Sequence, residues 1–204
     1  MEKTETSINN NPGEIPMVGD HLALDLLNTE MRVGNESVDL WRSGEDVHAW
    51  LVRCGLLASA SIAAAAAAAA EKQTLLRQAR ELRALARQLI EQWKNGQMGD
   101  VQPLNKFLDA YLSAPQVIPT DAGRLVLTRV AKADPVANLL GPVAEAVAQL
   151  LTDGELDLVK KCAHPECILW FYDRTKSHKR RWCSMASCGN RHKAAQFRKK
   201  VGTT

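Results

Sequence analysis

The chain has 204 residues, of which 46% are hydrophobic and 24% are charged, and this composition is that of a globular protein with one core and room for an appendage. No apolar run approaches the length of a membrane span, and the polar, acidic residues 1–6 do not form a secretory signal. We therefore expect a cytoplasmic protein with no membrane partner.

The formal net charge of +3 hides a division along the chain. Residues 160–204 contain twelve Lys and Arg against two acids, which gives +10, whereas residues 1–159 contain 14 basic and 21 acidic residues, which gives −7. A dense positive patch attracts phosphate backbones, so the sequence predicts an acidic body and a basic arm with different partners.

The first part of the chain predicts two helices after a disordered lead-in. Residues 1–16 are polar and rich in Asn, Pro and Gly, which favours disorder. Asp20 is a candidate cap for a helix over residues 21–31, whose leucines form an apolar stripe. Ser43 is a candidate cap for a second helix, and Gly55 is its stop signal. On that helix Cys54 is interpreted as a small buried hydrophobe.

The middle of the chain predicts three more helices and one hairpin. The eight alanines at 63–70 favour a helix that continues amphipathically to about residue 96, and a further helix follows over residues 104–111. Residues 117–118 and 124–130 flank a turn, which predicts a β-hairpin with alternating exposure. The last helix of the body covers residues 136–151, with Pro142 as a candidate break.

Three polar side chains share one face of the first predicted helix: Asp25, Asn28 and Thr29. They could line a small-molecule pocket in which Asp25 binds a cationic or hydroxyl group. They could equally cap neighbouring backbone groups, as these residue types often do.

Four cysteines in the last quarter carry most of the functional information: Cys162, Cys167, Cys183 and Cys188. Each pair encloses four residues and fifteen residues separate the pairs, a spacing typical of a Zn²⁺ ion held by four thiolates. The alternative is four buried thiols without a ligand, which so polar a module could hardly bury. His164, His178 and His192 could replace a cysteine, but with four cysteines present we interpret them as surface residues or phosphate contacts.

The residues around the cysteines predict a knuckle, a hairpin and a helix, which is the treble-clef order. The hairpin pairs residues 170–173 with 180–183, and the helix runs from Asn190 to Lys200 with Ala194, Ala195 and Phe197 facing inward. Five of the ten aromatic residues fall in this module. We interpret them as its small core, and base stacking is the alternative.

Two segments resemble known bacterial families. The run Arg181-Trp182-Cys183-Ser184-Met185 and the motif Cys188-Gly189-Asn190-Arg191, together with Cys162, Cys167, Phe171 and Asp173, resemble the CGNR zinc finger. The segment Gly19-Asp20-His21-Leu22-Ala23-Leu24-Asp25-Leu26-Leu27-Asn28-Thr29 resembles the opening of the ABATE domain. The resemblance implies a stress-linked transcription regulator with a sensory or regulatory body and a treble-clef DNA-binding finger.

Candidate nucleic-acid contacts are the basic residues of the module, because Lys and Arg bind phosphates independently of sequence. The alternative is an ordinary solvated basic face. Asn190 and Arg191 could read base edges, but their position beside Cys188 favours bracing of the zinc knuckle. The full set of candidates is Arg174, Lys176, Lys179, Arg180, Arg181, Asn190, Arg191, Lys193, Arg198, Lys199 and Lys200.

The sequence thus predicts an α+β protein: a disordered lead-in over 1–16, a mainly helical ABATE-like domain with a small β-hairpin over 17–155, and a treble-clef CGNR-type zinc finger over 156–204. We expect a zinc-dependent regulator that binds duplex DNA, with a small-molecule effector and a homodimer as further candidate partners. The alternative is a structural zinc module that binds RNA or a protein. No catalytic motif is present and the cysteines close the metal site, so we expect no enzyme.

Overall fold

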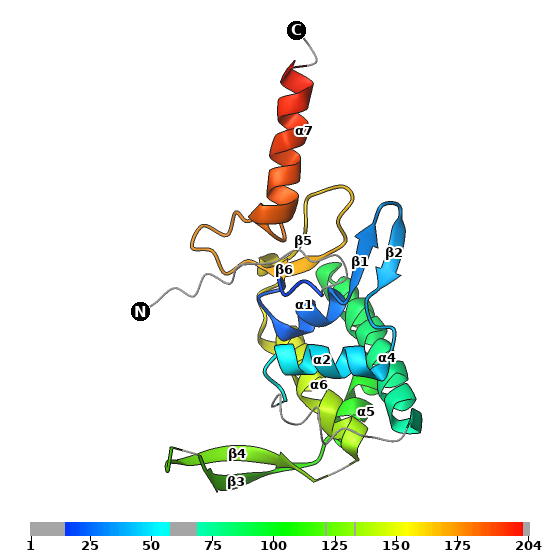
Figure 1. Cartoon of the computed structure of the whole chain (residues 1–204), viewed down its shortest axis with the longest axis vertical. Helices are drawn as coiled ribbons and strands as arrows, with labels where there is room; N and C mark the ends of the chain where they lie inside the picture. The colour runs from blue at the N-terminus through cyan, green and yellow to red at the C-terminus, as the bar shows by residue number, and fades with distance from the viewer. Residues whose placement is uncertain (1–14, 58–68, 121, 133, 202–204) are drawn as a thin grey trace. The chain divides into compact units, whose positions relative to one another are not determined.

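The computed structural model describes residues 15–57, 69–120, 122–132 and 134–201 (Figure 1). Most of the predicted lead-in, residues 1–14, and the alanines at 63–68 lie outside the described residues. Ile15 is buried, with 7% of its surface exposed, so ordered packing begins inside the segment that we expected to be disordered. None of the described helices is long and apolar enough to span a membrane.

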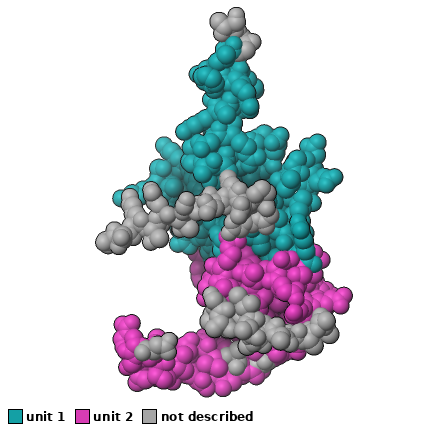
Figure 2. Space-filling model, in the orientation of Figure 1, with its two compact units in different colours: residues 1–42, 154–204 teal, residues 43–153 magenta. Residues whose placement is uncertain are grey.

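The chain forms two compact units, shown in different colours in Figure 2. One unit joins residues 1–42 to residues 154–204, and the other contains residues 43–153. Packing therefore places residues 15–42 with the cysteine module, although composition groups them with the helical body. The first unit contains every cysteine of the two close pairs.

The N-terminal part of the first unit is a short helix and a hairpin. Helix α1 (Leu22–Leu27) precedes strands β1 (Glu30–Val33) and β2 (Glu36–Asp39), which pair antiparallel around Gly34 at φ +63°. The predicted helix over 21–31 is therefore too long, because its last residues enter a strand. The cap prediction was also wrong: the side chain of His21, and not that of Asp20, accepts the N–H of Ala23 at 3.2 Å.

The second unit is a helical body. It contains α2 (Gly44–Arg53), α4 (Ala69–Lys94), α5 (Gln102–Ala110) and α6 (Pro135–Asp153). Ser43 caps α2 in a capping box with Asp46, as its position before the helix predicted. Apolar residues of α2, α4 and α6 form the core, among them Trp50, Leu82 and Val147, each no more than 1% exposed.

Helix α6 continues through Pro142, so the candidate break does not occur. Tyr111 packs closely against α6 next to Pro142, because its ring occupies the space that a Cβ at Gly141 would need. Cys54 ends α2 and is partly buried, less than we expected.

Strands β3 (Ser113–Pro119) and β4 (Leu125–Ala131) form the predicted hairpin in the second unit (Figure 1). The expected alternation of exposure is absent. Val117 and Leu127 on one face are 60% and 72% exposed, and Ile118 and Val126 on the other are 42% and 43% exposed. Both faces of the ribbon are therefore open to solvent.

The cysteine module belongs to the first unit. A 3₁₀ turn (Leu156–Leu158) leads into β5 (Val159–Lys161), which pairs antiparallel with β6 (Trp170–Tyr172). We predicted that residues 170–173 pair with residues 180–183, and this was wrong: residues 180–183 form no strand, and β6 pairs with β5 instead. A π-helical turn (Met185–Gly189) then opens α7 (Asn190–Val201). The α+β class with a C-terminal treble-clef finger is confirmed.

Candidate metal centre and basic surface

The four cysteines come from two turns, one after β5 and one at the start of α7. Cys162 directly follows β5, and a tight turn in which the N–H of Cys167 donates to the carbonyl of His164 at 2.9 Å brings the second sulfur back. Cys183 lies two residues before the π-helical turn, and Cys188 lies within it. Each pair is thus placed by local backbone structure, because four intervening residues suffice for one turn.

The four sulfur atoms converge on one point, and all lie within 4.8 Å of one another. The sulfurs of Cys167 and Cys183 are 3.7 Å apart, and those of Cys183 and Cys188 are 3.6 Å apart. A Zn²⁺ ion with tetrahedral sulfur ligands at about 2.3 Å requires sulfur separations of roughly 3.8 Å. The cysteines are free and the observed spacings are far longer than a disulfide bond, so the donor set fits a closed four-thiolate metal site.

Electrostatics within the cluster also favour a cation. Hydrogen bonds from Cys167, Cys183 and Cys188 lower the pKa of Cys162, whereas hydrogen bonds with Cys162, Cys167 and Cys188, in that order of importance, raise the pKa of Cys183. Four thiolates this close together repel one another unless positive charge lies between them. A divalent cation at the centre would stabilise all four thiolates together.

Hydrogen bonds to the sulfurs hold the cluster in place. The N–H of Cys183 donates to the sulfur of Cys162 at 3.3 Å, and the guanidinium of Arg191 donates to the sulfur of Cys188 at 3.3 Å. Asn190 donates from its side chain to the carbonyl of Ala186 at 3.3 Å. Both residues therefore make the bracing contacts that their place in the motif favours.

The core around the cluster includes residues from both ends of the chain. Val18 is 5% exposed and packs with Leu169, Phe171 and three of the cysteines, and Met31 lies against the same cluster. A small zinc module has little apolar surface of its own, so these N-terminal side chains enlarge its core.

Asn28 joins the N-terminal segment to β6. Its side-chain amide donates to the carbonyl of Trp170 at 2.9 Å, and its side-chain oxygen accepts the N–H of Trp170 at 2.8 Å. Asn28 is fully buried, so these two hydrogen bonds satisfy backbone groups that water cannot reach. In addition, the N–H of Tyr172 donates to the carbonyl of Gly19 at 2.7 Å.

The other members of the predicted pocket also bond to backbone. Asp25 accepts the N–H of Gly19 at 2.8 Å, and the hydroxyl of Thr29 donates to the carbonyl of Leu26 at 2.8 Å. With Asn28, these side chains are at most 7% exposed. The three therefore act as the backbone-capping alternative describes, and none of them lines the pocket described below.

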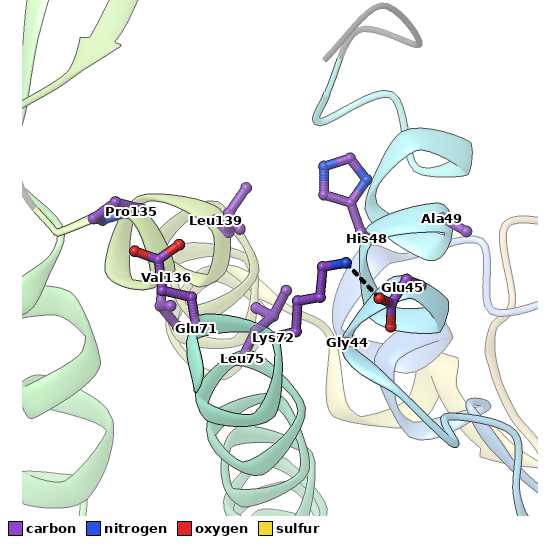
Figure 3. Close-up of a pocket in the computed structure, with 10 residues that line it drawn as sticks. All are labelled: Gly44, Glu45, His48, Ala49, Glu71, Lys72, Leu75, Pro135, Val136 and Leu139. Atoms are coloured by element: carbon purple, nitrogen blue, oxygen red, sulfur yellow. Dashed lines mark ion pairs between the residues drawn. The ribbon is translucent and has the colours of Figure 1, made fainter. Parts of the chain in front are cut away.

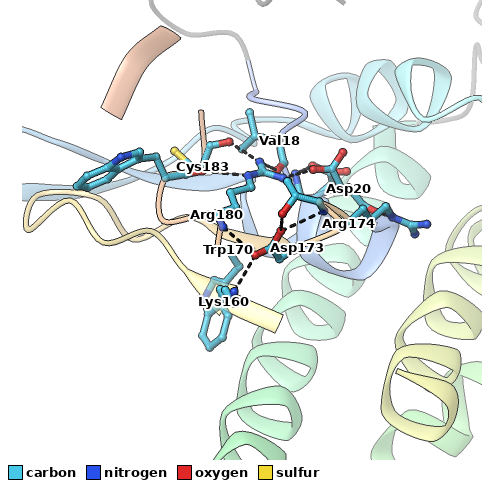
Figure 4. A network of polar contacts seen from close by, with 12 residues as sticks. Val18, Asp20, Lys160, Trp170, Asp173, Arg174, Arg180 and Cys183 are labelled. Carbon is cyan, nitrogen blue, oxygen red and sulfur yellow. Dashed lines mark hydrogen bonds and ion pairs between the residues drawn. The ribbon is translucent and has the colours of Figure 1, made fainter. Parts of the chain in front are cut away.

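A buried polar network centred on Asp173 lies beside the cluster (Figure 4). The carboxylate, which has no exposed surface, accepts Lys160 Nζ at 2.7 Å, the Thr175 hydroxyl at 2.6 Å and the Arg180 N–H at 2.9 Å. Burial alone would raise the pKa of Asp173, but the hydrogen bonds from Lys160, Thr175 and Arg180 outweigh it and hold the pKa below its usual range.

The side chain of Arg180 connects the network to the N-terminal segment. Its guanidinium donates to the carbonyls of Cys183 at 2.6 Å and Val18 at 3.0 Å, and it forms an ion pair with Asp20 (Figure 4). It also stacks on the ring of Phe171, 4.2 Å from the centroid. The structure thus uses Arg180 inside the finger, although we predicted it as a nucleic-acid contact.

The other predicted contacts divide into three groups. Arg174 and Arg181 are exposed but rest on aromatic rings, since Arg174 lies 5.5 Å from the centroid of Tyr172 and Arg181 lies 5.0 Å from that of Trp182. Lys176 and Lys179 lie in the exposed loop between β6 and Cys183. The predicted contacts on α7 are all exposed: Asn190, Arg191, Lys193, Arg198, Lys199 and Lys200.

Helix α7 has no buried residue, which corrects the inward orientation that we expected. Ala194 is exposed and Phe197 is 68% exposed. The histidines lie outside the sulfur cluster: His164 accepts the N–H of Glu166, His178 contacts the carbonyl of Asp173, and His192 packs on Trp182 with 4.7 Å between ring centroids.

The second unit contains a pocket of about 130 Å³ (Figure 3). Leu75, Val136 and Leu139 form part of its apolar lining, and Lys72 forms an ion pair with Glu45 across it at 2.7 Å. That hydrogen bond to Lys72 lowers the pKa of Glu45 to about 2. Sequence reasoning missed this pocket, because its lining residues come from three helices and share no motif.

Comparison with known families agrees with the motifs. Residues 20–154 match the family model ABATE, described as "Putative stress-induced transcription regulator", and residues 159–200 match the CGNR zinc finger. No curated protein sequence matches the chain. The two family segments meet between residues 154 and 159, close to the boundary that the charge distribution indicated.

Proposed function

This chain belongs to the ABATE family and carries a CGNR zinc finger, and from that membership we propose that it is a zinc-dependent, DNA-binding transcription regulator with a sensory or regulatory N-terminal domain. The observation that carries the proposal is that α7, which has five Lys and Arg residues, no acid and no buried residue, is directly attached to a four-sulfur cluster. We place the protein in the cytoplasm, where thiols stay reduced and available to a metal.

The proposed cofactor is Zn²⁺, held by Cys162, Cys167, Cys183 and Cys188. Its role is structural, because four protein sulfurs leave no open position for water or substrate. The ion would fix the direction in which α7 leaves the knuckle. We therefore propose no catalytic activity for this site.

Duplex DNA is the proposed partner of the basic surface. Helix α7 contains five Lys and Arg residues and no acid among its twelve residues, and none of its residues is buried. A helix of this kind can approach a groove while its charges contact phosphates. The exposed Lys176 and Lys179 would add phosphate contacts from the preceding loop.

The pocket of the helical body supports the regulatory part of the proposal. It combines an apolar lining with a charged pair at Lys72 and Glu45. Such a site suits a small, mainly apolar effector with one polar group. We propose it as the effector site in place of the face that carries Asp25, Asn28 and Thr29.

A binding titration with the full zinc-loaded chain tests the proposal. We expect the chain to bind a random duplex DNA pool more tightly than single-stranded RNA, with an affinity that falls steeply with salt. Cys188→Ser should abolish this binding because it opens the metal site, whereas Cys54→Ser, outside the cluster, should bind normally. Preference for RNA would favour the alternative RNA-binding module, and binding to neither nucleic acid would remove the proposal.

A further inference from the structure

The hairpin β3–β4 presents an unusual amount of apolar surface. On one face Val117, Leu125 and Leu127 are 60%, 74% and 72% exposed, and the opposite face carries Ile118 and Val126. A two-stranded ribbon with both faces in water is marginally stable by itself. Pairing with a further strand, or contact with another surface, would bury this apolar area and stabilise the hairpin.

The hydrogen-bond pattern shows which edge groups point outward. The N–H of Thr120 donates to the carbonyl of Arg124, and that of Lys132 donates to the carbonyl of Leu112, both at 2.7 Å. Hydrogen-bonded pairs alternate along an antiparallel ladder, so the even-numbered residues of β4 bond to β3. The odd-numbered residues point their N–H and C=O groups away from β3: Leu125, Leu127, Arg129 and Ala131.

The two outer edges of the hairpin differ. By the same alternation, the outward positions of β3 include Pro115 and Pro119, which have no N–H to donate. Proline on an edge strand blocks pairing with another strand. Strand β4 contains no proline, and β3 is its one neighbour among the described residues. The edge of β4 is therefore the one suited to pairing.

The outer edges of two β4 strands can pair with each other. An antiparallel pair of β4 strands centred on Thr128 places Leu125 opposite Ala131, and Leu127 opposite Arg129, in both directions. All four outward residues of each strand would then form hydrogen-bonded pairs. The strand has a single charged residue, Arg129, which faces Leu127 and not a like charge. The apolar face of each hairpin would continue across the junction.

We propose that β4 pairs antiparallel with β4 of a second copy of this chain, which forms a two-fold symmetric dimer with a four-stranded sheet. The same surface serves on both copies, as two-fold symmetry requires. The proposal concerns assembly and does not depend on DNA binding. If both proposals hold, the dimer supplies two fingers to one binding site.

Matched proline variants test the edge. Val117 and Leu127 lie directly opposite each other on the same face, and each has an outward N–H. Leu127→Pro removes that donor from the β4 edge, and by symmetry it removes two donors from the interface. We expect the dimer dissociation constant, measured by sedimentation equilibrium, to rise by about 100-fold. Val117→Pro lies on the edge of β3, which Pro115 and Pro119 already block, and should leave the dissociation constant unchanged.

Circular dichroism of each variant checks that the helical body stays folded. If Leu127→Pro does not fold, Leu127→Lys replaces it, since two lysines near the two-fold axis disfavour pairing while keeping the backbone donor. A wild-type chain that stays monomeric at about 100 μM in sedimentation equilibrium would overturn the proposal. A dimer that neither variant weakens would overturn it as well.

A cross-link tests the register independently. The proposed register places Thr128 opposite Thr128 of the second copy in a non-hydrogen-bonded pair, with Cα atoms about 4.5 Å apart, which a disulfide can span. Thr128→Cys should give a covalent dimer under mild oxidation. Gln116→Cys, directly opposite Thr128 on β3, lies one strand further from the axis and should not. Cross-linking no greater than in Gln116→Cys and the wild type would contradict this register.

Discussion

At the scale of single residues, the finger depends on side chains that lie far from it in sequence. Asn28 and Trp170 are 142 residues apart, yet one amide satisfies both the N–H and the C=O of the tryptophan. The Asp and Asn of the ABATE opening motif both bond to backbone groups, Asp25 to Gly19 and Asn28 to Trp170. Their residue types indicated either a pocket or backbone capping, and only the positions of their partners distinguish these roles.

Replacement of Asn28 by Ala leaves a buried donor and a buried acceptor of Trp170 without partners. We expect this change to lower the free energy of unfolding of the zinc-loaded chain by about 2–4 kcal/mol. Urea titration followed by tryptophan fluorescence would measure it. Asn190→Ala is the control, because that amide is exposed and makes one 3.3 Å hydrogen bond. Equal effects of the two substitutions would contradict a structural role for Asn28.

At the scale of secondary structure elements, most helices of the body could be predicted and the strands only in part. The capping box at Ser43 and the stop at Gly55, which has φ +72°, are local signals, and they held. The pairing of β6 with β5 could not be read in the same way, because aromatic residues 170–172 suit a strand but do not name its partner. Helix α7 was expected to pack inward, whereas none of its residues is buried.

The basic end of α7 allows a test of its contacts with DNA. Replacing Arg198, Lys199 and Lys200 by Gln keeps helix propensity and removes three positive charges. We expect binding to weaken similarly for all sequences, and the slope of log affinity against log salt to fall by about 0.9 for each lost phosphate contact.

The matched control for that variant carries Arg77, Arg80 and Lys106 as Gln. These residues are exposed on helices of the second unit, so the net charge changes equally. If the control flattened the salt dependence as much as the α7 variant, the effect would reflect net charge and not contacts made by α7.

At the scale of the whole molecule, the division into two units does not follow the order of the chain. Residues 15–42 pack with the finger, and residues 43–153 form the other unit. Val18, Met31 and the Asn28–Trp170 hydrogen bonds are the physical basis of this division. The family boundaries near residue 155 describe sequence similarity, whereas packing crosses them.

Removal of the metal should expose this division. When a chelator removes the ion, we expect amide hydrogen exchange to accelerate in residues 159–189 and also in residues 18–31, because the latter complete the core of the finger. Residues 82–90 and 143–150, in the core of the other unit, should keep their protection. Mass spectrometry of exchanged peptides would measure this, and unchanged exchange in residues 18–31 would contradict the shared core.

The sequence by itself determined the cysteine cluster, the basic arm and the main helices. In each cysteine pair, one turn of four intervening residues places the two sulfurs. Helix caps and apolar periodicity also act within a few residues, so local sequence is enough to predict these features. The hydrogen bonds of Asn28, the use of Arg180 inside the finger and the open edge of β4 became visible in the folded chain alone. Each of these depends on which distant backbone groups become neighbours, and that is fixed by packing of the folded chain and not by local propensity.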